Sequence, residues 1–90
     1  MNGDSKIKLI KKLNVTDMSG DKVMIDFETG KYFLLKGTAS DIWDCVQKDT
    51  SVEEIVSHLL DLYEVDRQTC QQGVENFLLQ MEKYGFVTIE

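Results

Sequence analysis

The sequence predicts an α+β fold, with a three-stranded antiparallel sheet packed on a three-helix bundle. Apolar and polar residues alternate up to about residue 36, and this period of two is typical of strands. From Gly37 onward the apolar residues recur every three or four positions, as they do on the core face of a helix. Strands followed by helices, without βαβ alternation, indicate a two-layer domain.

The first strand is expected over residues 7–15. Its apolar residues alternate with lysines, although Ile10 breaks the parity of the others. Residues 18–21, which include Ser19 and Gly20, are then predicted to form a turn.

A hairpin is expected next, with strands at 22–28 and 31–36 joined at Thr29 and Gly30. Alternation in its first strand divides the side chains between two faces. The residues expected to face the core are Val23, Ile25 and Phe27, and those expected to face solvent are Lys22, Asp26 and Glu28.

The second arm of this hairpin is apolar on both faces. Tyr32 and Leu34 share one side, and Phe33 and Leu35 share the other. Since an exposed face is normally polar, either another element covers the second face or a partner does. The second alternative describes a peptide-binding edge.

Three helices are expected over residues 39–48, 52–63 and 67–84, and Trp43 is expected to anchor the first of them in the core. Ser51 and Glu54 have the spacing of a capping box at the start of the second helix, and Asp66 is suited to cap the third. Gly85 lies where a left-handed C-terminal cap is expected, and residues 86–89 are expected to continue as an extended tail.

The composition of the 90 residues fits one small domain with a modest core. The net charge of −6 is uneven, because residues 1–36 carry a surplus of two positive charges and residues 37–90 a deficit of eight. No membrane-length apolar run or signal-like segment is present, so a cytoplasmic location is expected, with Cys45 and Cys70 as free thiols.

Catalysis has little support in the sequence, and we expect no enzyme activity, metal site or cofactor. His58 is the single histidine and lies opposite the apolar stripe of its helix, as a solvated side chain does. Two isolated thiols and one imidazole do not make a zinc site, and there is no glycine-rich phosphate loop.

DNA binding is the alternative function, because three helices beside a hairpin also suggest a winged helix-turn-helix. Phosphate neutralisation requires lysine and arginine. The third helix offers only Arg67 and Lys83 against Asp66, Glu75 and Glu82, so repulsion is expected to outweigh attraction.

An ordered set of short motifs between residues 22 and 88 resembles the PqqD-like family, the recognition elements for ribosomally synthesised, post-translationally modified peptides. The motifs are Asp26-x-x-Thr29-Gly30-x-Tyr32-Phe33-x-Leu35, Gly37, Ile42-Trp43, Ser51-Val52-Glu53-Glu54-Ile55, Leu59 through Tyr63, Val74-x-x-Phe77-Leu78 and Gly85-Phe86-Val87. The resemblance implies a winged-helix-like bundle. It also implies that the leader segment of a precursor peptide binds as an added strand on the third strand, beside the third helix.

The resemblance is greatest to the discrete recognition proteins of lasso-peptide pathways. It implies that the chain delivers its precursor to a leader peptidase and to a lasso cyclase. Acidic leader residues could be attracted by Lys31 and Lys36, which flank the edge; edge protection against aggregation is the alternative role for these lysines.

The candidate peptide-binding residues come from the third strand and from the third helix. Within the helix, one edge of the apolar stripe carries Gly73, whose position in mid-helix suggests close approach of the bound strand. The full set is Lys31, Tyr32, Phe33, Leu34, Leu35, Gly73, Val74, Phe77, Gln80, Met81 and Tyr84.

Overall fold

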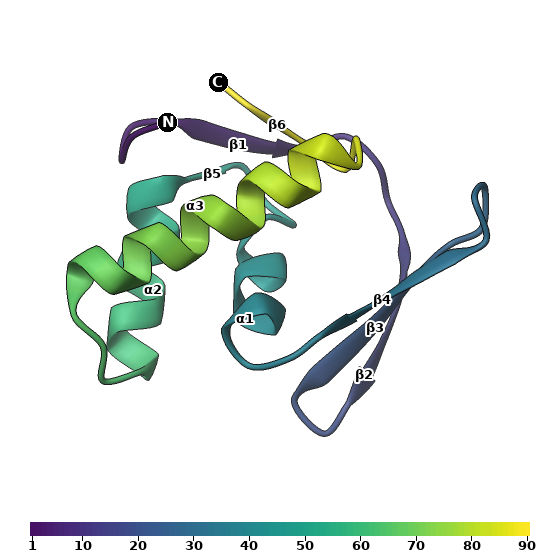
Figure 1. Ribbon diagram of the computed structural model, residues 1–90, viewed down its shortest axis with the longest axis horizontal. Coiled ribbons are helices and arrows are strands. Elements are labelled where there is room, and N and C mark those ends of the chain that lie inside the picture. Colours follow the sequence, from purple (N-terminus) through teal and green to yellow (C-terminus); the bar gives the residue numbers. More distant parts are fainter.

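The computed structural model, which describes residues 1–90, contains two separate antiparallel sheets and three helices (Figure 1). One sheet has the order β5-β1-β6 and the other β2-β3-β4. The strands are β1 (Lys6–Leu9), β2 (Asn14–Met18), β3 (Asp21–Asp26), β4 (Lys31–Leu35), β5 (Thr50–Ser51) and β6 (Val87–Ile89), and the helices are α1 (Thr38–Cys45), α2 (Val52–Leu62) and α3 (Arg67–Lys83). The α+β class and the three helices agree with the sequence prediction.

The prediction of a single strand over residues 7–15 is wrong, because this segment forms two strands in different sheets. β1 lies between β5 and β6, whereas β2 pairs with β3. Ile10, which breaks the alternation, is exposed where the chain leaves the first sheet, and its N–H donates to the carbonyl of Phe86 (3.0 Å). The extended tail expected after Gly85 contains β6, the partner of β1.

The facing of β3 is also opposite to the prediction. Lys22, Met24 and Asp26 are buried on the side of the sheet that faces the helices, while Val23 and Ile25 are half-buried on the outer side. Phe27 follows the end of β3 and is exposed.

Ion pairs explain why the charged side chains of β3 lie inside. The Nζ of Lys22 contacts carboxylates of Asp17 (2.6 Å) on β2 and of Asp44 (3.2 Å) on α1, and the Nζ of Lys11 lies 3.0 Å from Asp26. A buried charge is tolerated only with such a partner. These pairs also join the sheet to α1 and to the segment that connects the two sheets.

The turns and caps largely follow the local signals in the sequence. Ser19 and Gly20 both have positive φ in the two-residue turn between β2 and β3. The hydroxyl of Ser51 accepts from the N–H of Glu54 (3.2 Å), and the carboxylate of Asp66 accepts from the N–H of Thr69 (3.3 Å). After α3, the C-terminal cap forms at Gly85 with φ of 82°. α1 ends at Cys45, earlier than expected, in a hydrogen-bonded turn.

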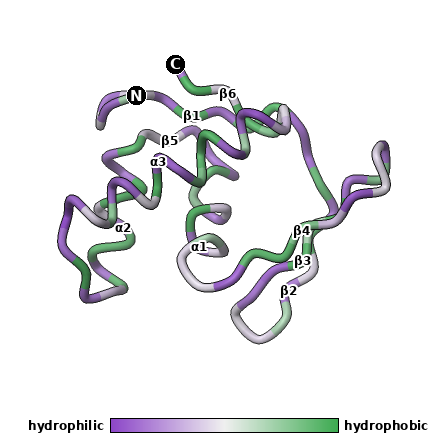
Figure 2. The backbone as a smooth tube through the Cα atoms, in the orientation of Figure 1, coloured by the Kyte–Doolittle hydropathy of each residue, from purple (hydrophilic) through white to green (hydrophobic).

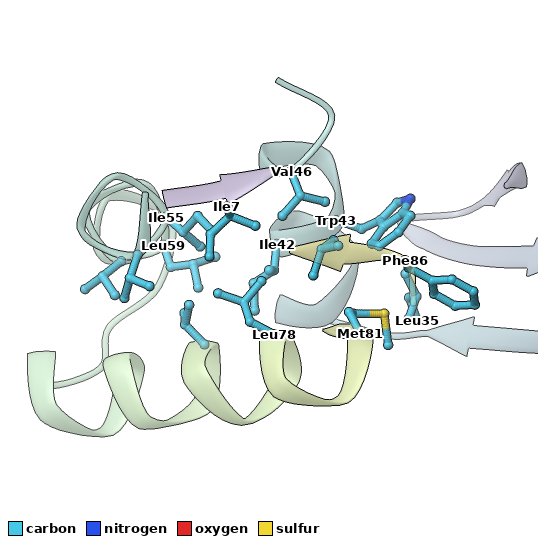
Figure 3. Close-up of a cluster of buried hydrophobic side chains, with 14 of the residues drawn as sticks. Ile7, Leu35, Ile42, Trp43, Val46, Ile55, Leu59, Leu78, Met81 and Phe86 are labelled. Carbon is cyan, nitrogen blue, oxygen red and sulfur yellow. The ribbon is translucent and has the colours of Figure 1, made fainter. Parts of the chain in front are cut away.

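The core lies between the helices and β1, and it includes one residue of β4 (Figure 3). Trp43 is 2% exposed, as expected for the anchor of α1. Leu35 at the end of β4 and Met24 of β3 are both buried in this cluster, so the sheet is attached to the bundle through two of its own apolar side chains. No helix has the length and apolarity needed to cross a membrane.

We predict that Asp26→Asn lowers the stability of the domain at neutral pH. The hydrogen bond from Lys11 is the main reason that the pKa of Asp26 lies below its ordinary value of 3.8. A lowered carboxyl pKa contributes stability above the ordinary value, and this contribution is lost as the pH falls through the folded-state pKa. Urea unfolding at pH 7 should therefore show a loss in Asp26→Asn that shrinks below about pH 4.

Asp61→Asn is the matched control, because Asp61 is exposed on α2 and forms no ion pair. The Asp61→Asn variant should have a stability close to that of the wild type at both pH 7 and pH 2. An equal loss for Asp26→Asn at pH 7 and pH 2 would contradict the role of the charge.

Candidate functional site

The candidate site is the edge of β4 that is not paired with another strand. β4 pairs with β3 on one side only, in a register that places Lys31 opposite Asp26 and Leu35 opposite Lys22. Of the three strands in this sheet, β4 lies nearest to α1 and α3 (Figure 1). Alternate residues of an edge strand direct both the N–H and the C=O outward, so β4 presents donors and acceptors for a further strand.

The inner face of β4 turns its aromatic side chain toward the C-terminal end of α3. The ring of Phe33 is half-buried, with its centroid 5.0 Å from that of Tyr84 and 5.4 Å from that of Phe86. Tyr84 stacks on Phe86 at 5.6 Å, and Phe86 also meets Trp43 edge to face at 6.4 Å. This aromatic cluster connects the middle of β4 to α3 and to the core.

The two faces of β4 therefore differ in their surroundings. Phe33 and Leu35 face the helices. Tyr32 and Leu34 point to the other side of the sheet and are 76% and 53% exposed. Figure 2 shows hydrophobic residues along β4 and hydrophilic residues at the hairpin tip that precedes it.

The candidate residues of α3 divide into a buried row and an exposed row. Val74 and Met81 are in the core and Phe77 is partly buried against it. The exposed residues are Gly73, Gln80 and Tyr84, with Tyr84 placed beside Phe33. The structure thus brings β4 and the C-terminal end of α3 together, while Gly73 lies more than two helical turns away from Tyr84 along α3.

Positive charge flanks β4 at both ends. Lys31 begins the strand and Lys36 follows it, and both side chains are exposed and free of ion pairs. Lys11 and Lys22, by contrast, are occupied by carboxylates on the inner side of the sheet. The two flanking lysines are therefore available to an approaching ligand.

The two thiols and the histidine lie on the three helices and not on β4. Burial is the main cause that raises the pKa of the thiols of Cys45 and Cys70, which favours their neutral form. Both thiols are free, and His58 is exposed on α2. No group of three or more histidine, cysteine, aspartate and glutamate side chains is arranged to hold a metal ion.

Sequence reasoning missed two features close to β4. Val23 and Ile25 were assigned to the core, but they share the outer face with Tyr32 and Leu34. Phe86 was expected in the extended tail, and the contact of its ring with Phe33 was not predicted. The Gly85 cap was the available signal for Phe86, since it reverses the chain and directs the next residue back against α3.

Comparison with known proteins decides the family. The model of the family described as Coenzyme PQQ synthesis protein D (PqqD) matches residues 21–87. The chain belongs to the PqqD family. This match spans the hairpin, all three helices and the first residue of β6. It confirms the resemblance seen in the sequence motifs.

Two solved structures share the fold of this PqqD-family chain. The first, described as TbiB1 in complex with the TbiA(beta) leader peptide, is 26% identical with a TM-score of 0.79, and the match covers 89% of this chain and 93% of that one. The second, a lasso peptide synthetase B1 complexed with the leader peptide, is 20% identical with a TM-score of 0.76, covering 91% and 96% of the two chains. No curated protein matches the chain.

We predict that Phe33 and Tyr84 are energetically coupled. Aromatic pairs at this separation contribute about 0.5–1.5 kcal/mol beyond the area that they bury. A double-mutant cycle of Phe33→Ala and Tyr84→Ala, followed by urea unfolding, should give a coupling free energy in that range.

The control cycle pairs Tyr84→Ala with Tyr32→Ala, because Tyr32 lies on the opposite face of β4. Those two changes should be additive within about 0.5 kcal/mol. Additivity in the Phe33 cycle as well would show that the aromatic cluster does not connect β4 to α3.

Proposed function

We propose that this protein is a non-catalytic recognition protein that binds the leader segment of a ribosomally synthesised precursor peptide. The observation that carries the proposal is the unpaired edge of β4 beside α3, with the Phe33 ring between them. Adding a strand to such an edge is one of the recurring modes of peptide recognition. Membership of the PqqD family and the shared fold with two leader-peptide complexes support the proposal.

The backbone of β4 sets an upper limit on what strand addition contributes. In a strand of five residues, roughly two or three residues direct their backbone groups outward, which allows roughly four to six hydrogen bonds. Each contributes about 1 kcal/mol net, while micromolar affinity needs about 8 kcal/mol. Side chains must therefore supply part of the affinity and nearly all of the specificity.

We assign that part to the side chains of β4 and α3. Leader side chains that point toward the helices would contact Phe33 and Tyr84, and those of the other parity would lie beside Tyr32 and Leu34. The proposed peptide-binding set is Lys31, Tyr32, Phe33, Leu34, Leu35, Gly73, Val74, Phe77, Gln80, Met81 and Tyr84. Leu35, Val74 and Met81 have buried side chains, so they would support the residues that contact the peptide.

In this proposal the protein is an adaptor in the cytoplasm, most similar to the discrete recognition proteins of lasso-peptide biosynthesis. Bound precursor would be presented to a separate leader peptidase and to a cyclase. The acidic surface of the helices and the small number of cations on α3 favour a peptide ligand over DNA.

The decisive test is hydrogen exchange of the β4 amides in the presence of peptide. The synthetic TbiA(beta) leader serves as the first probe. The leader of any short precursor found to be encoded beside the gene for this chain is the second. At least one should bind with a dissociation constant on the order of 1 µM. On binding, the outward-facing amides of β4 should exchange at least about tenfold more slowly, because they gain hydrogen bonds.

β2 provides an internal control, since it is the opposite edge of the same sheet. Its amides should not change, and neither a scrambled peptide nor duplex DNA should protect β4. Protection confined to β2 or to the helices would contradict strand addition on β4, and binding to DNA alone would favour the winged-helix alternative.

We also predict that Lys31 and Lys36 accelerate the association of an acidic leader. The double variant Lys31→Gln, Lys36→Gln should lower the association rate at low salt, and the difference from wild type should vanish near 1 M salt, where screening acts over about 3 Å. Stopped-flow mixing across a salt series measures this.

Lys48→Gln is the matched control, because Lys48 is exposed beyond the C-terminal end of α1, whereas β4 leads into the N-terminal end. This variant should associate like wild type at every salt concentration. A rate in the double variant that equals wild type at low salt would leave edge protection as the role of these lysines.

A further inference from the structure

The ammonium group of Lys22 links the sheet β2-β3-β4 to the helix α1. Its Nζ lies 2.6 Å from a carboxylate oxygen of Asp17 on β2 and 3.2 Å from one of Asp44 on α1. The first contact stays within the sheet, whereas the second crosses from the sheet to the helices. No other ion pair connects a strand of this sheet with a helix.

The helix that carries Asp44 is itself held in the bundle. Asp44 follows Trp43, which is 2% exposed and meets Phe86 edge to face at 6.4 Å. In addition, the hydroxyl of Tyr63 at the end of α2 donates to the carboxylate of Asp41 on α1. The carboxylate of Asp44 therefore has a fixed base from which to hold the sheet.

The ion pair lies at the end of β4 that enters the bundle. Lys22 is opposite Leu35, and Phe33, which meets Tyr84, comes two residues earlier on β4, about 7 Å away along the strand. The hydrophobic effect is non-directional, so the apolar contacts of Phe33, Leu35 and Met24 allow small tilts of the strand. A charge-assisted hydrogen bond has a narrower geometry and restricts such tilts.

A tilt of β4 would affect one part of peptide binding more than the other. Backbone hydrogen bonds to an added strand follow β4, because they are made with the strand itself. Contacts of the peptide side chains with Tyr84, at the end of α3, depend instead on the distance between β4 and that helix. A gap of about 0.5–1 Å already removes a quarter to a half of the van der Waals attraction between two atoms.

We propose that Asp44, acting through Lys22, is a positioning residue for the leader peptide. Their ion pair holds β4 at the distance from α3 at which one bound peptide contacts both elements. The inference rests on the proposed function, and neither residue belongs to the proposed peptide-binding set. Asp17 does not share the role, because it lies in the same sheet as Lys22.

Asp44→Ala and Asp17→Ala are the matched variants that test this. Both carboxylates contact the same ammonium group, and neither has another cation as a partner. The side chain of Lys22 is only 10% exposed, and each variant leaves it with one carboxylate. The cost of burying the charge is thus compensated in both.

Urea unfolding should rank Asp17→Ala as the less stable of the two variants. Asp17 makes the closer contact, and its hydrogen bond is the main cause that raises the pKa of Lys22 above the ordinary value. Asp44 lies in the last turn of α1, where a carboxylate opposes the helix dipole and alanine is the better helix former.

The affinity for the leader should rank the variants in the opposite order. Asp44→Ala should weaken binding at least about fivefold, because β4 is no longer held in the binding position, while Asp17→Ala should bind like wild type. Asp44→Glu should recover most of the affinity, since it restores a carboxylate to α1. Calorimetry with the same synthetic leaders that protect the β4 amides measures this.

Residual dipolar couplings of the backbone amides test the orientation of the sheet without any peptide. In the wild type and in Asp17→Ala, the couplings of the sheet and of the helices should fit one common alignment tensor. In Asp44→Ala the sheet should require a separate tensor, because it tilts relative to the helices.

An affinity that follows stability, or a wild-type affinity in Asp44→Ala, overturns the positioning role while strand addition stands. Weaker binding by Asp44→Ala without a change in the orientation of the sheet overturns it as well. If no leader binds the wild-type protein, the proposed function fails, and the couplings then decide alone. A common tensor in Asp44→Ala would refute the positioning of β4, and separate tensors would support it.

Discussion

The buried charges on the inner face of β3 determine how the rest of the site is arranged. Because Lys22 and Asp26 both find partners inside, the side of β3 that carries them faces the helices. The register with β4 then places Phe33 opposite Met24 and Leu35 opposite Lys22, on the same inner side. A shift by one residue would exchange the two faces of every strand in the sheet. The ion pairs and the buried Met24 side chain on the same face thus favour the arrangement in which Phe33 and Leu35 meet the bundle.

The same sheet is attached to the bundle by few contacts. Met24 and Leu35 enter the core. Phe33 meets Tyr84 and Phe86, and Lys22 reaches Asp44 on α1. The rest of the hairpin projects beyond the helices (Figure 1). This arrangement leaves the far edge of β4 free along its length while the middle of the strand is held in place. An edge that is held but not covered is suited to accept an additional strand without rearrangement of the fold.

Local signals in the sequence were sufficient for the helices but not for the sheet. Ser51, Asp66 and Gly85 each mark a helix end through hydrogen bonds to residues three to five positions away, so no distant information is needed. The facing of β3 depends instead on Asp44 and on Lys11, which lie in other segments of the chain. A prediction from apolar–polar alternation assigns every lysine and aspartate to the solvent-facing side of a strand. It therefore fails where such a residue is buried together with its ion-pair partner.

The candidate site shows the same division. The strand from Tyr32 to Leu35, which is apolar on both faces, could be identified from the sequence alone. This requires only the knowledge that odd and even positions of a strand point to opposite faces. The contact of Phe33 with Phe86 could not be predicted from the sequence, and neither could the division of residues 7–15 between two sheets. Both depend on the position of β6. Pairings between residues so far apart in sequence are a property of the folded topology.

The position of β1 between β5 and β6 has a consequence for the order in which the domain matures during translation. A ribosome adds about 5–20 residues per second, so β1 waits several seconds for Val87–Ile89 to be synthesised and to clear the exit tunnel. Phe33 is synthesised after β1 and waits a shorter time for Phe86. A nascent chain that lacks Phe86 has no ring for Phe33 to meet at that position and no β6 to pair with β1, so the side of β4 that faces α3 is completed only after residues 86–89 are synthesised.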